Sequence, residues 1–225
     1  MLRAVLFDLD GTLANTERQN AESVARVLER RGRPLSDAER EFVIGHGWAE
    51  IHHNLVSNGG VDLPLEELMR LAAKERAVIV RDEGLEVLPG AVELVQRVTK
   101  RYASAVVSGS SREEVHMCLE ALGVLSCFPW FLGAEDTSRG KPFPDGYLLA
   151  ATRLGIAPAE CLVIEDSSAG IDAARAAGMV VFGVRAGNFA KQPQERAHRV
   201  LDTLLEIDDA LLARVSAGDY IGMKA

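Results

Sequence analysis

The chain has 225 residues, enough for one domain or for a domain that carries an insertion. Its formal net charge of −8 argues against a general nucleic-acid binder, whose affinity depends on basic contacts to phosphates, although a locally positive site can still bind a small anion. No apolar stretch is long enough to cross a bilayer and no signal-peptide pattern opens the sequence, so we expect a soluble, cytoplasmic protein with neither a membrane nor a nucleic acid as partner.

The first predicted strand is the apolar run Ala4–Phe7, and two aspartates follow it at once. A run of this kind is typical of a parallel strand that is buried on both faces. Gly11 lets the backbone turn sharply after Asp8 and Asp10. Two ionised carboxylates about 4 Å apart repel each other by roughly 4 kcal/mol at an effective dielectric of about 20. The pair therefore indicates either a hard metal ion or acid–base chemistry, and a solvated, aspartate-rich turn is the alternative.

The stretch after this turn is too long for a single crossover between two strands. Apolar residues recur at helical spacing in two places, at residues 21–28 and 65–72, and each pattern predicts a helix with one apolar face. We therefore expect an all-helical cap domain, residues 15–86, inserted into an α/β catalytic core made of residues 1–14 and 87–225.

The second predicted strand, Ala103–Val107, ends in the small residues Ser108–Ser110. Ser111 and Glu114 have the spacing of a capping box, so a helix is expected to begin there. A strand end, small residues and a helix N-terminus can together bind an anion through backbone N–H groups and a serine hydroxyl. An ordinary connection between a strand and a helix is the alternative.

Three more apolar runs, Trp130–Leu132, Cys161–Ile164 and Val180–Val184, predict further strands. Lys141 precedes a proline, which restricts it to an extended conformation and so sets the direction of its side chain. Glu165–Asp166 again places carboxylates at a strand end. Taken singly, the lysine fits a solvated surface residue, and the two acids fit a helix N-terminus. Strands that alternate with helices predict a Rossmann-like, doubly wound parallel sheet, which binds ligands at the carboxyl ends of its strands.

These four signals, each at a strand end and in this order, resemble the motifs of the haloacid dehalogenase superfamily of phosphotransferases. The counterparts of the four motifs are Asp8–Thr12, Ser108, Lys141 and Glu165–Asp166. Residues 140–145 and 165–174 are further similar to the subgroup that contains β-phosphoglucomutase and phosphoglycolate phosphatase. The resemblance covers essentially the whole chain and is weakest over residues 17–86.

The resemblance implies a phosphatase that hydrolyses a small phosphomonoester, such as a sugar phosphate or a phosphoglycolate-like metabolite. Asp8 would be the nucleophile that forms an aspartyl-phosphate. Asp10 would protonate the leaving alkoxide and then activate water. The groups that would hold the phosphoryl oxygens and balance their charge are Ser108, the N–H groups of Gly109 and Ser110, and Lys141.

The resemblance also implies a Mg²⁺ cofactor. This ion prefers octahedral oxygen ligands and keeps several waters, so few protein ligands suffice. Its ligands would be Asp8, the backbone carbonyl of Asp10, and Asp166. Glu165 would be a further ligand or would support the ligands from behind.

A sugar phosphomutase of the β-phosphoglucomutase type is the main alternative, because it resembles this chain in all four motifs. Such mutases usually carry a cap arginine for a distal phosphate where this chain has Trp48, and tend to carry a histidine where it has Asn20. Both departures favour a hydrolase. Trp48 and His46 are our candidates for substrate contacts from the cap, with packing inside the cap as the alternative. A non-catalytic binding protein is disfavoured because no motif residue is missing, and we expect a monomer or a weak dimer.

Overall fold

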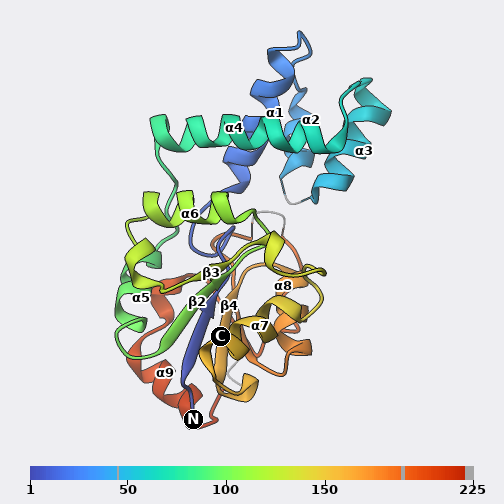
Figure 1. Ribbon diagram of the computed structural model, residues 1–225. Helices are drawn as coiled ribbons and strands as arrows, with labels where there is room; N and C mark the ends of the chain where they lie inside the picture. The colour runs from blue at the N-terminus through green and yellow to red at the C-terminus, as the bar shows by residue number, and fades with distance from the viewer. Residues whose placement is uncertain (45, 189–190, 221–225) are drawn as a thin grey trace. The chain divides into compact units, whose positions relative to one another are not determined.

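The computed structural model describes residues 1–44, 46–188 and 191–220, and Figure 1 shows their secondary structure. The chain forms two compact units. The first comprises Met1–Asn15 together with Glu86–Ala225, and the second comprises Thr16–Leu85. We call them the α/β unit and the helical unit.

The described residues of the α/β unit form a six-stranded sheet with the strand order β3-β2-β1-β4-β5-β6. The strands are β1 (Ala4–Phe7), β2 (Ala103–Val107), β3 (Phe131–Leu132), β4 (Cys161–Glu165), β5 (Val180–Val184) and β6 (Arg199–Leu201). All neighbouring strands are parallel, which confirms the predicted fold class. The chain runs outward from β1 to β3 and then returns to β4 on the other side of β1. Ligands of open α/β sheets bind at such a reversal of strand order.

The strand predictions held where the apolar run was long. Strand β6 was not predicted, because it is only three residues long and its first two, Arg199 and Val200, are only partly buried. Strand β3 is shorter than expected: Trp130 lies outside it and packs, partly buried, against the core of the sheet.

Helices connect the strands of the α/β unit. They are α5 (Ala91–Val98), α6 (Arg112–Ala121), α7 (Asp145–Leu154), α8 (Ser168–Ala176) and α9 (Asp209–Ser216). Short 3₁₀ turns cover Leu125–Cys127, Ala134–Asp136, Pro158–Glu160 and Leu204–Glu206. The predicted capping box opens α6, where the Ser111 hydroxyl accepts the N–H of Glu114.

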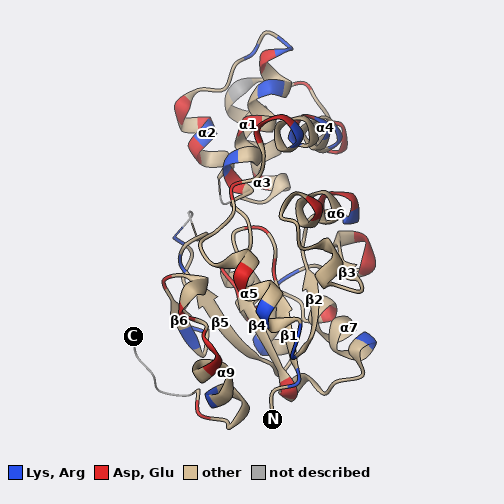
Figure 2. Ribbon diagram, turned by 90° about the vertical axis from the view of Figure 1, so that its left-hand side faces the viewer, with Lys and Arg blue, Asp and Glu red and all other residues tan. Residues whose placement is uncertain are grey.

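Both faces of the sheet are covered. Ala4 and Leu6 of β1 are fully buried in a cluster that also contains Tyr147 of α7 and apolar residues of α8. Side chains alternate along a strand, so Phe7 points to the opposite face, where its ring meets Phe128 edge to face at 6.0 Å. Charged residues accordingly lie mainly on helices and loops, and few are seen on the central strands (Figure 2).

The helical unit is made of α1 (Glu17–Glu29), α2 (Asp37–Val43), α3 (Trp48–Gly59) and α4 (Leu65–Glu83). The two predicted helices lie within α1 and α4, whose apolar stripes share a buried cluster that includes Val24, Leu28 and Leu68. Helices α2 and α3 were not predicted: α2 has a single buried residue, and the apolar spacing of Trp48, Ile51 and Leu55 in α3 was not recognised. Along the described residues, no helix combines the length and the apolar character that spanning a membrane requires.

The α/β unit itself holds together the two chain segments through which the insertion departs and returns. The N–H of Asn15 donates to the Glu86 carbonyl at 2.8 Å, and its side-chain amide donates to the Glu86 carboxylate at 2.7 Å. Ala14 forms an antiparallel bridge with Val87. We call these paired residues the stem.

Candidate active site

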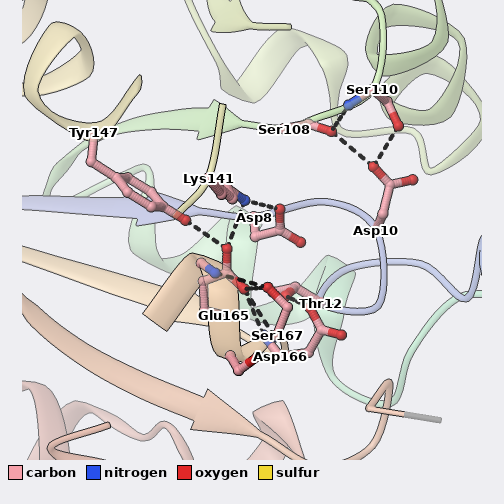
Figure 3. A network of polar contacts seen from close by, with 12 residues as sticks. Asp8, Asp10, Thr12, Ser108, Ser110, Lys141, Tyr147, Glu165, Asp166 and Ser167 are labelled. Atoms are coloured by element: carbon pink, nitrogen blue, oxygen red, sulfur yellow. Dashed lines mark hydrogen bonds and ion pairs between the residues drawn. The ribbon is translucent and has the colours of Figure 1, made fainter. Parts of the chain in front are cut away.

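The register of the sheet brings the strand-end residues together. Phe7 of β1 lies opposite Val106 of β2 on one side and Ile164 of β4 on the other. Asp8 continues this pairing, and its N–H donates to the Ile164 carbonyl at 3.0 Å. The side chains of Asp8 and Glu165 therefore meet at the carboxyl edge of the sheet, as Figure 3 shows.

Lys141 is a partly buried cation that bonds both of these carboxylates. Its Nζ donates to Asp8 Oδ1 at 2.5 Å and to Glu165 Oε1 at 2.6 Å (Figure 3). Burial by itself lowers the pKa of the ammonium group, but the charges of Asp8 and Glu165 outweigh it and raise the pKa well above its usual value. Lys141 therefore stays positively charged at neutral pH.

The pKa of the Asp8 carboxyl is raised far above its usual value. Burial first, and then the charges of Glu165 and Asp10, raise this pKa from 3.8 to about 7 against the lowering effect of Lys141. The second oxygen of Asp8, Oδ2, is buried, and none of the described residues donates a hydrogen bond to it. A buried carboxylate oxygen without a partner is costly, so this atom is suited to meet a cation or a reacting group.

Glu165 is completely buried and, in contrast to Asp8, fully hydrogen-bonded. Its Oε1 accepts from Lys141 and, at 2.9 Å, from the hydroxyl of Tyr147. Its Oε2 accepts from the N–H groups of Asp166 and Ser167, each at 3.0 Å, and from the Ser167 hydroxyl at 2.9 Å. This carboxylate is thus fixed in position by the protein alone.

The carboxylate of Asp10 lies with the serines that were predicted to bind phosphate. Its Oδ2 accepts from the hydroxyls of Ser108 and Ser110, both at 2.8 Å, and the Ser108 hydroxyl accepts the N–H of Ser110 at 2.9 Å. Ser108, Gly109 and Lys141 also line a cavity of about 220 Å³ within the α/β unit. Three of the four predicted phosphate-binding residues therefore share this cavity, whereas Ser110 and Asp10 are not among its lining residues.

Three carboxylates, those of Asp8, Glu165 and Asp166, offer oxygens within 4.8 Å of one another. Gly11, at φ +83°, leaves room for this cluster, because a Cβ there would lie 2.3 Å from Asp166 Oδ2. A hard-oxygen donor set together with the unpartnered Asp8 Oδ2 fits a Mg²⁺ ion. The side chain of Asp10 is outside this cluster.

The two residues expected to contact substrate from the insertion both have partners within the helical unit. The ring of His46 stacks on Phe42 with centroids 3.9 Å apart. Trp48, the first residue of α3, is half-buried and packs against the unit's apolar core. Gly45, which precedes His46, lies outside the described residues.

Two residues of this neighbourhood were not recognised as site residues in the sequence. In the sequence, Tyr147 stands in an apolar helical pattern with Leu148, Ala151 and Leu154, although a buried tyrosine usually needs a partner for its hydroxyl. Gln194 is buried, and its Nε2 donates to the backbone carbonyls of Asp166 at 2.6 Å and Val184 at 2.9 Å. No motif marks this glutamine, because its partners are backbone atoms distant in sequence.

Strand-end aspartates, a buried lysine and an acidic cluster on a doubly wound sheet define the class of haloacid dehalogenase-type hydrolases. A family model described as haloacid dehalogenase-like hydrolase matches residues 2–178. The chain belongs to this family.

Individual relatives share most of their length with this chain. Validoxylamine A 7'-phosphate phosphatase of Streptomyces hygroscopicus subsp. limoneus is 34% identical over 92% of this chain and 96% of its own length. β-Phosphoglucomutase of Bacillus subtilis (strain 168) is 28% identical, over 83% of this chain and 84% of its own. The crystal structure of CbbY from Rhodobacter sphaeroides in complex with phosphate has a TM-score of 0.81 at 24% identity, covers 92% of this chain and 96% of that one, and supports the fold.

Proposed function

We propose that this protein is a Mg²⁺-dependent phosphatase that hydrolyses a small phosphomonoester, such as a sugar phosphate, through an aspartyl-phosphate on Asp8. The observation that carries the proposal is the state of the Asp8 carboxylate: Lys141 holds one oxygen, while the other is buried and accepts no hydrogen bond from the described residues. A relative named for the removal of phosphate from validoxylamine A 7'-phosphate supports a phosphomonoester as substrate.

In the first step, the Asp8 carboxylate attacks the phosphorus atom, the bond to the leaving oxygen breaks, and an acyl phosphate forms. The ammonium of Lys141 fixes Asp8 through Oδ1 and balances negative charge that gathers on the phosphoryl oxygens. Ser108 and the N–H groups of Gly109 and Ser110 hold those oxygens. Phosphoryl transfer depends mostly on such positioning and charge neutralisation.

Asp10 acts as the acid and then as the base. Its carboxylic proton passes to the leaving alkoxide. The carboxylate then takes a proton from a water that attacks the phosphorus of the aspartyl-phosphate, which releases inorganic phosphate and regenerates Asp8. The hydroxyl of Ser110 orients Asp10 for this work, and the Ser108 hydroxyl would exchange its hydrogen bond to Asp10 for one to a phosphoryl oxygen.

The residues that would hold Mg²⁺ are Asp8 and Asp166, with the backbone carbonyl of Asp10. When bound, the ion supplies positive charge that screens the repulsion between a carboxylate nucleophile and an anionic phosphate ester. The buried and unpartnered Asp8 Oδ2 supports this assignment, because a cation relieves the cost of burying it.

A sugar phosphomutase stays the second candidate, since a β-phosphoglucomutase is among the relatives. Hydrolysis is favoured because a mutase must hold a bisphosphate, and Trp48 offers no charge where mutases use an arginine. We further propose a cytoplasmic location and a monomer or weak dimer.

A screen of the purified protein against many phosphomonoesters, with Mg²⁺ present and released phosphate as the readout, tests the proposal. We expect turnover of a small sugar phosphate and none in Asp8→Asn, which keeps the size of the side chain but removes the nucleophile. Substantial multiple turnover by a folded Asp8→Asn protein would refute the role of Asp8. Efficient isomerisation of a sugar phosphate without phosphate release would establish the mutase instead.

A further inference from the structure

The segment that follows β3 runs beside the loop that follows β2. The N–H of Ser108 donates to the Leu132 carbonyl at 3.1 Å, and the N–H of Ala134 donates to the Ser110 carbonyl at 2.9 Å. We call Ser108–Ser110, which carry predicted phosphate-binding groups, the phosphate loop, and we call residues 133–136 the β3 turn. The backbone of the phosphate loop is therefore held by the β3 turn as well as by its own strand.

The β3 turn also meets the start of α6, two residues beyond the phosphate loop. A Cβ at Gly133 would lie 2.6 Å from the backbone nitrogen of Arg112, so the two backbones are in direct contact. That nitrogen donates to Glu135 Oε2 at 3.0 Å. A carboxylate is favourable there, because the first N–H groups of a helix have no partner within it. The β3 turn thus contacts the chain at the phosphate loop and again just after it.

The carboxylate of Asp136 ties these segments together. Only 3% of its side-chain surface is exposed. Its Oδ1 accepts from the guanidinium of Arg112 at 2.5 Å and from that of Arg153, in the last turn of α7, at 3.4 Å. Its Oδ2 accepts the N–H of Gly133 at 3.0 Å. Hydrogen bonds between ionised partners are among the strong ones, so one carboxylate fixes the β3 turn against the start of α6.

The cavity of the α/β unit is lined from both sides of this junction. Ser108 and Gly109 line it from the phosphate loop, Gly133 from the β3 turn, and Lys141 from the segment that follows the turn. Lys141 lies only five residues beyond Asp136. A phosphoryl group held by the loop and by the lysine at once requires a fixed separation between them. A misplacement of about 1 Å can cost about 100-fold in rate.

We propose that Asp136 is a positioning residue that acts through Arg112 to hold the phosphate loop at the separation from Lys141 at which both bind one phosphoryl group. The inference rests on the proposed function, which supplies that group. Asp136 is not among the residues that line the cavity, so it acts on the loop and not on the substrate. Arg112 is its effective partner, because it begins α6 just after the phosphate loop, whereas Arg153 lies near the far end of α7.

Three variants test the inference. Asp136→Asn keeps the size of the side chain and removes its charge. Arg112→Gln removes the effective partner at a side chain that is 57% exposed, so its fold should be preserved. Arg153→Gln is the matched control, because it removes the same type of side chain from the same acceptor atom on another helix.

Calorimetry measures the Kd for inorganic phosphate in saturating Mg²⁺ and the Kd for Mg²⁺ alone. We expect the phosphate Kd to rise about tenfold in Asp136→Asn and Arg112→Gln, because the phosphate loop is no longer fixed. In Arg153→Gln it should stay within about twofold of wild type, as is usual when an exposed ion pair is lost. The Mg²⁺ Kd should stay at its wild-type level in all three variants.

Amide hydrogen exchange reports on the loop without requiring any ligand. The Ala134 N–H, which donates to Ser110, should exchange about tenfold faster in Asp136→Asn and Arg112→Gln than in wild type, while the amides of β1 and β4 keep their rates. In Arg153→Gln the Ala134 rate should not change.

Two results would overturn the inference. If Asp136 is only structural, the melting temperature should fall in Asp136→Asn and Arg112→Gln while the phosphate Kd stays at its wild-type level. A phosphate Kd that rises as far in Arg153→Gln as in Arg112→Gln would also refute it. Neither measurement requires turnover. A wild-type protein that binds phosphate but hydrolyses no phosphomonoester would therefore refute the proposed function, while the role of Asp136 is still decided by these measurements.

Discussion

Asp8 should destabilise the metal-free protein at neutral pH, so Asp8→Asn should make that form more stable while removing activity. Burial raises the pKa of the Asp8 carboxyl from 3.8 to about 7. Each pKa unit corresponds to about 1.4 kcal/mol, so ionising Asp8 inside the fold costs about 4 kcal/mol relative to the unfolded chain. Asparagine resembles the protonated carboxyl and does not ionise.

The sign of the effect follows from linkage. The folded-state pKa is the higher one, so the contribution of the protonated Asp8 is fully present below about pH 3.8 and is lost as the pH rises through about 7. The Asp8→Asn protein keeps this stability at every pH, because asparagine does not ionise. The stability difference between variant and wild type should therefore widen by about 2.5 kcal/mol between pH 5 and pH 8.

Urea unfolding of EDTA-treated proteins across this pH range measures the difference directly. Asp202→Asn is a suitable control, because the Asp202 side chain is 74% exposed and should change stability by no more than about 0.5 kcal/mol at any of these pH values. Saturating Mg²⁺ should stabilise the wild type, by about 2.7 kcal/mol at 100 times its Kd. An Asp8→Asn protein that is no more stable than wild type at pH 8, or a difference independent of pH, would refute the reasoning.

EDTA should abolish phosphate release and added Mg²⁺ should restore it; full activity in chelator would contradict a metal-assisted mechanism. Calorimetry should show that Asp166→Ala weakens Mg²⁺ binding more than Glu165→Ala does. Trp48→Ala should raise KM for the best ester in the screen and leave hydrolysis of p-nitrophenyl phosphate nearly unchanged, whereas an equal loss toward both would limit Trp48 to packing in the helical unit. The hydrogen bond from Arg33 lowers the pKa of Glu39 from 4.5 to about 2. The stability that ionised Glu39 contributes to the fold is therefore present above about pH 4.5 and is lost as the pH falls toward 2. Glu39→Gln should therefore lower the free energy of unfolding at pH 7 by about 1 kcal/mol, with a smaller effect in acid. Urea unfolding at several pH values measures this, and a difference between variant and wild type that is the same at every pH would contradict it.

The fold could be predicted largely because a parallel strand covered on both faces leaves a continuous apolar run. Ala4–Phe7 and Val180–Val184 are buried throughout, and their bounds were predicted correctly. Strand β6 lies at the edge of the sheet, where partial burial leaves no such run. Helix α2 has a single buried residue, Val43, so its sequence carries little periodicity to detect.

The acids of the candidate site could be located from the sequence because each follows a strand, and parallel strands end at the same edge of the sheet. The separate roles of these acids could not be predicted from the sequence. Whether Glu165 is free or saturated depends on Tyr147, eighteen residues earlier in the chain, and on which way α7 turns its hydroxyl. Such a contact between helix and strand is a product of tertiary packing and leaves no local pattern.

The stem has a consequence for how this protein can be altered. Asn15 and Glu86 are already hydrogen-bonded to each other, so a short turn can join them with little additional cost of loop closure. Residues 16–85 are therefore a replaceable cassette. Deleting it or grafting a foreign one in its place need not disturb the register of β1 with β2 and β4. An exchange of this insertion would leave intact the strand ends that carry the candidate site.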